Sequence, residues 1–239
     1  MKLQPKEVAL WRVDLDDARW DSLEWLLDSG ERIKAMQFHT DQLRGRSRRC
    51  RSALRCILSH HTGLSPSGLR LAANRFGKPE LAGNRVHFNV THTEGWALIA
   101  VAGEPVGVDL EQALRPAIAI EEIAALACHP AEEASLQALG GIPANAALMR
   151  LWTHKEAYVK ALGTGLRHAL TAVRLAPAAG AACVLVVDDS CGATKPYFVY
   201  EVEAPARFVA SLCIAAPDAA IRGRDASVLL QVPMGQQQA

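Results

Sequence analysis

The sequence predicts an α+β protein built from two similar α/β lobes, related by pseudo-twofold duplication, each with a small, mostly antiparallel sheet packed against a long helix. The 239 residues are enough for two domains of about 120 residues. Each half combines strand-like segments with one long helix that carries charged side chains, and Arg-Val-Asp-Leu at 12–15 is echoed by Gly-Val-Asp-Leu at 107–110. We therefore expect an N-terminal lobe at 1–104, a C-terminal lobe at 105–216 and a weakly ordered tail at 217–239.

The composition is that of an ordinary globular protein. Half of the residues are hydrophobic and 21% are charged, and no apolar run is long enough for a membrane helix. The formal net charge of +1 argues against a surface made wholly for nucleic acid. Six scattered cysteines, with no C-x-x-C pair and no apolar signal segment, indicate reduced thiols. We expect a cytoplasmic protein with no membrane and no nucleic acid as partner.

In the first third of the chain, periodicity predicts one strand and three helices. The strand covers 8–15, and the helices run from Asp16 to Gly30 and over 31–39 and 41–61. The third helix is rich in arginine, most of it on a solvated stripe: Arg44, Arg48, Arg51 and Arg55. Arg46 instead projects along the buried side, where an arginine usually has an anionic partner.

A turn at 75–81 and a β meander follow. Its strands cover 86–90, 96–102 and 106–111; if each pairs with the next, the turn holding His92 reaches the same sheet edge as Asp109 and Glu111. Alternation puts Val106, Val108 and Leu110 on one face of the third strand and Gly107, Asp109 and Glu111 on the other. The two carboxylates are then about 6–7 Å apart, close enough to share a cation.

The C-terminal half predicts three helices and then three strands. The helices cover 118–126, 130–139 and 151–162, and the strands 182–187, 197–202 and 207–214. Glu156 and Lys160 share one face of the third helix, which Gly163 and Gly165 end. On an isolated helix such a pair is usually a weak surface ion pair, so its meaning depends on its neighbours.

Together Asp109, Glu111 and Glu156 predict a site with three carboxylate ligands. With no cysteine or close histidine pair beside it, this all-oxygen set suits Mg²⁺ better than zinc. Mg²⁺ held by few carboxylates usually completes its shell with water and substrate phosphates, so the substrate should be phosphorylated. The cations that could offset several phosphate charges are Lys34, Arg46, Lys78, His92, Lys155 and Lys160. A pyrophosphate with an extra phosphate fits them better than a single phosphate.

Four motifs carry a resemblance to a known family. Gly-Val-Asp-Leu-Glu at 107–111, followed by Trp-Thr-His-Lys-Glu-Ala-Tyr-Val-Lys-Ala-Leu-Gly-Thr-Gly-Leu at 152–166, resembles the paired signature of the 4′-phosphopantetheinyl transferases. The segments Phe-Gly-Lys-Pro at 76–79 and Phe-Asn-Val-Thr-His at 88–92 resemble two further motifs of that family. The chain is most similar to the large, monomeric, two-lobed type that acts on peptide and polyketide synthase carrier proteins.

The resemblance implies Mg²⁺-dependent transfer of the 4′-phosphopantetheine arm from coenzyme A to a serine hydroxyl of an apo acyl or peptidyl carrier protein, releasing adenosine 3′,5′-bisphosphate. It implies Asp109, Glu111 and Glu156 as metal ligands. Asp109, Glu156 and Lys160 would act in catalysis, with Glu156 as a base, directly or through water, and Lys160 stabilising the leaving phosphate. The residues implied in coenzyme binding are Lys34, Arg46, Lys78, Pro79, Thr91, His92, Asp109, Lys155 and Lys160. The carrier would dock near 114–128.

Two alternatives stay open at this point. The arginine run from Arg44 to Arg55 could form a nucleic-acid-binding module, which predicts steep salt dependence and no need for magnesium. A coenzyme A-binding scaffold with weak or no turnover is the second alternative, and the presence of all four of Asp109, Glu111, Glu156 and Lys160 argues against it.

Overall fold

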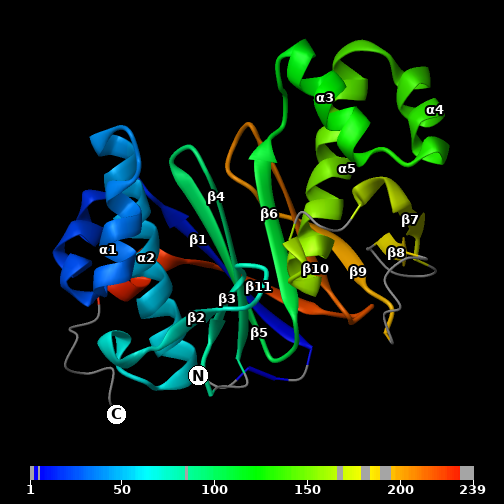
Figure 1. The fold of residues 1–239 in the computed structure, drawn as a ribbon. Coiled ribbons are helices and arrows are strands. Elements are labelled where there is room, and N and C mark those ends of the chain that lie inside the picture. The colour runs from blue at the N-terminus through cyan, green and yellow to red at the C-terminus, as the bar shows by residue number, and fades with distance from the viewer. Residues whose placement is uncertain are drawn as a thin grey trace.

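The computed structural model describes residues 3–4, 6–83, 86–165, 169–178, 184–188 and 195–231. Two sheets lie side by side, each with a long helix against it (Figure 1). The first sheet has the strand order β11-β1-β5-β4, and the second has the order β6-β10-β9-β8-β7. This architecture confirms the predicted α+β fold of two sheet-and-helix lobes.

In the described residues of the N-terminal half there are five strands and two α-helices. They are β1 (Glu7–Asp14), the 3-10 helix η1 (Ala18–Leu26), α1 (Ser29–Met36), α2 (Asp41–Thr62), η2 (Pro66–Gly68), β2 (Leu71–Ala73), β3 (Pro79–Leu81), β4 (His87–Thr93) and β5 (Trp96–Ala102). Local sequence sets the helix ends. Asp28 and Glu31 form a capping box at the start of α1, Thr40 caps α2, and Gly63 ends α2 in the left-handed conformation.

The C-terminal half has its helices grouped between its first strand and the others. Its elements are β6 (Val106–Gln112), α3 (Ala117–Ala127), α4 (Pro130–Leu139), α5 (Gly141–Leu162), η4 (Leu170–Ala172), β7 (Val173–Pro177), β8 (Val184–Asp188), β9 (Phe198–Val202) and β10 (Phe208–Ile214). Helix α5 begins ten residues before the predicted start at 151. The glycines at 140 and 141 both have positive φ. They mark the boundary between α4 and α5, and α5 begins at the second of them.

The two sheets share one apolar core. Val8 and Leu10 of β1, Leu98 of β5, and Val108 and Leu110 of β6 are all buried within a single cluster. The predicted alternation in β6 is therefore confirmed, because its apolar face lies in this core and its other face is turned towards α5. Burial on both sides holds β6 in a fixed register.

The predicted meander is wrong at its third strand. β4 pairs with β5 as expected, but β6 pairs with β10 of the other sheet rather than with β5. The turn at 103–105 thus carries the chain from one lobe to the other. β6 still runs beside β4, since the amide N of Val108 donates a 2.8 Å hydrogen bond to Asn89 Oδ1. β4 therefore lies near β6, the strand of Asp109 and Glu111, as predicted, but the two strands belong to different sheets.

The C-terminal segment differs from the predicted weakly ordered tail. β11 (Ala220–Asp225) pairs in parallel with β1, and η5 (Ala226–Leu230) places Ala226 and Leu229 in the N-terminal core. The open edge of β1 explains why this segment is ordered, because it supplies hydrogen-bond partners for the backbone of the mostly polar strand β11. Residues 232–239 of the tail lie outside the described residues, as do Cys183 in the predicted strand 182–187 and Leu166 at the end of the helix motif. The lobe boundaries remain a prediction.

Within the described ranges, no helix is both long and apolar enough to span a bilayer.

Candidate active site

The candidate site begins where α5 crosses β6. A Cβ atom added at Gly107 would lie 1.9 Å from the carbonyl oxygen of Ala157 and 2.4 Å from the amide nitrogen of Ala161. Real side chains never approach backbone so closely, so a residue without a side chain is required here. The close contact brings the outward-facing carboxylates of β6 directly against the polar face of α5.

Three predicted residues from three elements meet at this crossing. Asp109 of β6 is 3% exposed, and its Oδ1 accepts a 2.5 Å hydrogen bond from Lys160 Nζ of α5. Thr91 of β4 donates to the same oxygen at 3.3 Å and accepts from Lys160 Nζ at 3.4 Å. The site therefore lies between the lobes, with one contributor from the N-terminal sheet and two from the C-terminal half.

Glu111 and Glu156 complete the acidic group. Burial raises the pKa of Glu156; Lys160 lowers it in part, and the nearby charges of Asp109 and Glu111 raise it further. Burial and the charge of Asp109 likewise raise the pKa of Glu111, against the opposing effect of Arg115. Arg115 donates to Glu111 in an ion pair. The charge of Asp109 thus disfavours the ionisation of both Glu111 and Glu156, as expected where carboxylates lie close together.

The acidic group leaves two buried oxygens without hydrogen-bond partners. These are Oδ2 of Asp109 and Oε1 of Glu156. An unpartnered buried carboxylate oxygen is costly unless something else supplies positive charge. Within the described ranges no three His, Cys, Asp or Glu side chains are already arranged to hold a metal ion; Asp109 and Glu111 are paired with Lys160 and Arg115. The all-oxygen set with two unused, buried oxygens nevertheless fits a hard divalent cation.

Arg115 was missed by sequence reasoning. Asn145 of α5 holds the backbone of Arg115 by donating to its carbonyl oxygen at 2.8 Å and accepting from its amide at 3.3 Å. This fixes the loop after β6 against the start of α5. A signal was present in the sequence, since Arg115 follows Glu111 by four residues, but that spacing indicates a contact only in a helix, and this segment is not helical.

Lys155 is not part of this group of side chains. It is fully buried, and its Nζ donates to the carbonyl oxygens of Ala127 at 2.7 Å and Leu170 at 3.2 Å, and to Glu132 Oε2 at 2.6 Å. All three ammonium hydrogens are therefore used inside the C-terminal lobe. This arrangement contradicts the predicted coenzyme contact of Lys155. Glu132, in the first turn of α4, is its ion-pair partner.

Lys78 and Pro79 lie on the N-terminal side of the same crossing. Both line a cavity of about 210 Å³ with residues of β4 and the end of α5. Lys78 Nζ donates to three backbone carbonyl oxygens, those of Val106, Lys160 and Ala161. Burial lowers the pKa of Lys78 to about 8. The side chain therefore turns inward, away from the solvent side of the predicted nucleotide site.

The structure brings Arg46 and His92 together, but not Lys34. Arg46 and His92 line one cavity of about 130 Å³, and burial together with the charge of Lys160 lowers the pKa of His92. Arg46 also has the expected anionic partner, because it donates two hydrogen bonds to Asp16 at 2.7 and 2.6 Å. Lys34 lies exposed on α1, and no contact with the site connects it to Arg46 in the part of the chain that the structure describes.

The arginines of α2 are largely neutralised by acidic residues of η1 and α1. Arg48 pairs with Glu24, and Arg49 pairs with Asp21. Arg55, predicted to be solvated, is only 1% exposed and donates to Glu31 at 2.8 Å. The helix therefore lacks the continuous exposed basic face that the nucleic-acid alternative requires.

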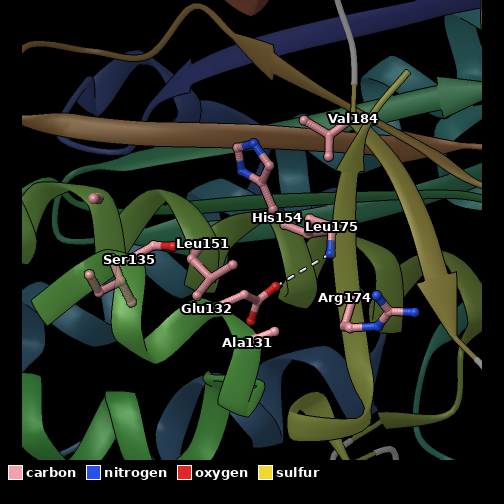
Figure 2. A pocket seen from close by; sticks show the side chains of 10 residues that line it. Ala131, Glu132, Ser135, Leu151, His154, Arg174, Leu175 and Val184 are labelled. Atoms are coloured by element: carbon pink, nitrogen blue, oxygen red, sulfur yellow. Dashed lines mark hydrogen bonds between the residues drawn. The ribbon is translucent and has the colours of Figure 1, made fainter. Parts of the chain in front are cut away.

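A larger cavity of about 450 Å³ lies elsewhere in the C-terminal lobe, between α4, α5, β7 and β8 (Figure 2). Its lining includes His154, Arg174 and Glu132, and Glu132 Oε1 accepts a hydrogen bond from the amide of Leu175 at 3.3 Å. None of the three predicted metal ligands lines it. The size of a cavity therefore does not by itself locate the group of carboxylates in this molecule.

Comparison with known proteins identifies the family of this chain. A family model described as the 4′-phosphopantetheinyl transferase superfamily matches residues 105–213. The chain is 34% identical to the 4′-phosphopantetheinyl transferase HetI of Nostoc sp., over 70% of this chain and 73% of that protein. It is 30% identical to a 4′-phosphopantetheinyl transferase of Bacillus subtilis, over 65% and 67% of the two chains, and 25% identical to the transferase Sfp of Bacillus subtilis, over 69% and 71%. The chain therefore belongs to the 4′-phosphopantetheinyl transferase family, as a member of its two-lobed type.

Proposed function

We propose that this enzyme transfers the 4′-phosphopantetheine arm of coenzyme A to a serine hydroxyl of an apo acyl or peptidyl carrier protein, with adenosine 3′,5′-bisphosphate as the second product. Membership of the transferase family gives the reaction class. The observation that supports the assignment of residues is the buried contact between Asp109 and Lys160 beside Glu156. It places both charge signs that phosphoryl chemistry needs at one point between the lobes.

Asp109, Glu111 and Glu156 would hold Mg²⁺, for which their oxygen-only chemistry and the unpartnered oxygens of Asp109 and Glu156 are suitable. When bound there, the ion would neutralise charge on the pyrophosphate under attack. Lys160 would then be released from Asp109 to meet the negative charge that develops on the leaving phosphate. Arg115 would likewise exchange its contact with Glu111 for contacts with the substrate or solvent.

Glu156 is the best-placed candidate for the general base. Burial raises the pKa of this carboxyl, which makes it a better proton acceptor once ionised than an ordinary surface glutamate. Oε1 of Glu156 has no hydrogen-bond partner, so that oxygen is available either to the metal or to the serine proton, directly or through a water molecule. A tight ligand is a poor base, and the metal and proton roles therefore compete for this oxygen.

The coenzyme would lie along the N-terminal side of the site. Thr91 and His92 would contact its phosphates, and Arg46, which lines the His92 cavity, would meet the 3′-phosphate in exchange for Asp16. The turn that carries Pro79 would flank the nucleotide, and exposed Lys34 on α1 would be a weaker contributor. The carrier would dock near 114–128, next to the reactive carboxylates.

We further propose that the enzyme works as a monomer in the cytoplasm. The four cysteines that fall within the described residues, Cys50, Cys56, Cys128 and Cys213, are all free thiols, which is typical of a reducing compartment. The two lobes of one chain already contribute Thr91, Asp109 and Lys160 to one site, so the proposed reaction needs no second subunit.

Mass spectrometry of apo carrier proteins tests the function. The enzyme is incubated with coenzyme A, Mg²⁺ and a panel of apo carriers from fatty acid, polyketide and peptide synthesis. We expect the mass of the phosphopantetheine arm to be added to at least one carrier, and the addition to disappear when the acceptor serine is replaced by alanine or Mg²⁺ is chelated. A panel with no mass gain at all, from an enzyme that still binds coenzyme A, would instead support the scaffold alternative.

A further inference from the structure

A turn of the N-terminal lobe is fastened to the end of α5. Asn74, just after β2, donates from Nδ2 to the carbonyl oxygen of Gly163 at 3.2 Å. Lys78, just before β3, donates from Nζ to the carbonyl oxygens of Lys160 at 2.6 Å and Ala161 at 3.3 Å. The same ammonium group reaches the carbonyl oxygen of Val106 in β6 at 3.1 Å. Two side chains of one lobe therefore bind the backbone of the helix and strand that carry the reactive groups of the other.

The turn is itself rigid, so the contact holds a fixed position. Asn74 Oδ1 accepts from the amides of Phe76 and Lys78 at 2.9 and 3.0 Å. The amide of Gly77 donates to the carbonyl of Asn74 at 2.9 Å, and Gly77 has φ +89°, a conformation that favours glycine. Lys78 is thus presented to α5 from a preformed hairpin rather than from a flexible loop.

The end of α5 has a physical need for such a donor. The last carbonyl groups of a helix have no amide partners within the helix, and they carry the negative end of its dipole. Gly163 caps one of them through its own amide, which donates to Val159. The carbonyl groups of Lys160 and Ala161 accept instead from the Lys78 ammonium group. Its hydrogens supply the missing hydrogen bonds, and its positive charge interacts favourably with the negative end of the helix dipole.

Lys78 has no carboxylate within ion-pair distance among the described residues, which distinguishes it from Lys155 and Lys160. Its three acceptors are all backbone oxygens. The titratable groups that influence it are Glu80 of β3, His87 of β4 and Cys213 of β10. An ammonium group surrounded by carbonyl oxygens, with no ion pair, is suited to holding backbone in place.

We propose that Lys78 is a positioning residue, which fixes the last turn of α5 across the lobe boundary so that Lys160 is held towards Asp109. This inference rests on the proposed role of Lys160 in transfer. In this inference the Lys78 ammonium group acts indirectly, through α5, and does not make the expected contact with the coenzyme. The backbone carbonyl oxygen of Lys160 accepts from Lys78, and the side-chain Nζ of Lys160 donates to Asp109. The backbone and the side chain of Lys160 are therefore held by two different elements.

Hydrogen exchange without any ligand tests the positioning directly. The variant Lys78→Met keeps the length of the side chain but removes its donor, and Lys195→Met is a matched control at an exposed lysine. We expect amide exchange at 159–163 to become about tenfold faster in Lys78→Met, with α2 unchanged in both variants. Asn74→Ala should give a smaller increase at the same amides. Unchanged exchange at 159–163 in a folded Lys78→Met protein would overturn the inference, whether or not the enzyme transfers the proposed group.

Kinetics then separate positioning from binding. We expect Lys78→Met to lower kcat about tenfold while KM for coenzyme A changes less than twofold; a raised KM with unchanged kcat would make Lys78 a coenzyme contact instead. In the parent enzyme, kcat should fall as the pH rises past about 8, the pKa of Lys78, because the neutral amine holds the carbonyl oxygens less strongly. Lys78→Arg should restore kcat and move this fall to higher pH. If Lys78→Arg fails to fold, Asn74→Ala with its smaller loss of kcat provides the same distinction.

Discussion

The two halves of the molecule repeat one arrangement and use it for different purposes. In the order of their sheets, β1-β5-β4 corresponds to β6-β10-β9, and a 22-residue helix, α2 or α5, packs on one face of each set (Figure 1). The pairing registers correspond as well, from Val8↔Ala102 in one half to Val106↔Ile214 in the other. The residues of β1 that face the helix, Ala9, Trp11 and Val13, therefore occupy the positions of Gly107, Asp109 and Glu111 in β6.

The difference at these positions separates an apolar core from the proposed reactive site. In the N-terminal half, Trp11 fills the space under α2, and its Nε1 donates to His61 Nε2 at 3.0 Å. In the C-terminal half, Asp109 binds Lys160 at 2.5 Å, and no large side chain separates β6 from α5 because Gly107 permits backbone contact. Burial of apolar side chains stabilises the interface between β1 and α2. At the interface between β6 and α5, charged groups are buried, so its stability depends on the partners that these charges bind.

Replacing Asp109 should break the C-terminal half of this comparison most severely. Asp109→Asn keeps the shape but removes the charge that faces Lys160 and the proposed Mg²⁺. Since loss of an outer-shell partner alone typically costs about 10–100-fold in activity, loss of a direct ligand should lower kcat/KM at least about a hundredfold. The measurement is transfer to an apo carrier at several Mg²⁺ concentrations.

The control for this substitution is Ser211→Ala in β10, the strand partner of Asp109, which leaves all three carboxylates in place. It should retain more activity than Asp109→Asn at every Mg²⁺ concentration. Near-normal turnover of Asp109→Asn at ordinary Mg²⁺ would show that the reactive site has been placed at the wrong residues.

The close contact of β6 with α5 gives the second prediction. In Gly107→Ala, the new Cβ would overlap the backbone of Ala157 and Ala161, so α5 must move away. We expect the free energy of unfolding to fall by about 2–3 kcal/mol and activity to fall with it, because Lys160 moves with the helix. The matched change in the other half, Ala9→Gly, should cost only about 1 kcal/mol. Urea denaturation with both variants measures the two values, and equal values would show that the halves do not differ in this way.

The expected signs of pH and Mg²⁺ dependence sharpen the comparison further. The pKa values of Glu111 and Glu156 are raised from 4.5 in the folded protein, chiefly by burial. A carboxyl group with a raised pKa stabilises the fold below its unfolded pKa, and this stabilisation is lost as the pH rises through the folded pKa. Without Mg²⁺, stability should therefore decline as the pH rises above about 4.5 through the raised values. Mg²⁺ binds the ionised forms, so the gain in Tm on adding it should be larger at pH 8 than at pH 5.

Scanning calorimetry measures this gain in Tm, which corresponds to about 1.4 kcal/mol in the free energy of unfolding at ten times the Kd of Mg²⁺. In Asp109→Asn the gain should largely vanish at both pH values. A Mg²⁺ effect that is the same at both pH values in the parent protein would contradict a site made from these carboxylates.

Sequence patterns predicted which side chains of β6 face α5 better than they predicted the topology around them. The alternation in β6 correctly separated Val108 from Asp109, since a buried face fixes the period. The apparent duplication signal was misleading, however. The four-residue similarity aligns Asp14 with Asp109, whereas the strand registers align Trp11 with Asp109. Asp14 lies on the same face of β1 as Val8 and Leu10, and Trp11 lies on the opposite face. The two alignments therefore differ by an odd number of residues. A four-residue similarity carries less information than the side of the sheet on which a residue lies.

The remaining errors came from interactions between segments far apart in the chain. Lys155 and Lys160 belong to one helix motif, but five residues turn a helix by about 140°, so Lys155 points to Ala127 and Glu132 instead of to the site. Strand β11 is ordered only because β1 offers it an edge. Neither outcome can be deduced from local periodicity, because each depends on a partner that the local sequence does not identify.

The N-terminal half should show the smallest effect and the clearest separation of stability from activity. Trp11→Phe removes the indole donor to His61 but keeps an aromatic ring in the space that Asp109 occupies in the other half. The loss of one buried hydrogen bond should lower the free energy of unfolding by about 1 kcal/mol, and kcat/KM should stay within a factor of two of the parent value. Urea denaturation and the carrier assay on the same preparation test both expectations. A fall in kcat/KM as large as that of Asp109→Asn would mean that the two interfaces are coupled through the shared core, and that the contact between β1 and α2 affects the reaction instead of only stabilising the fold.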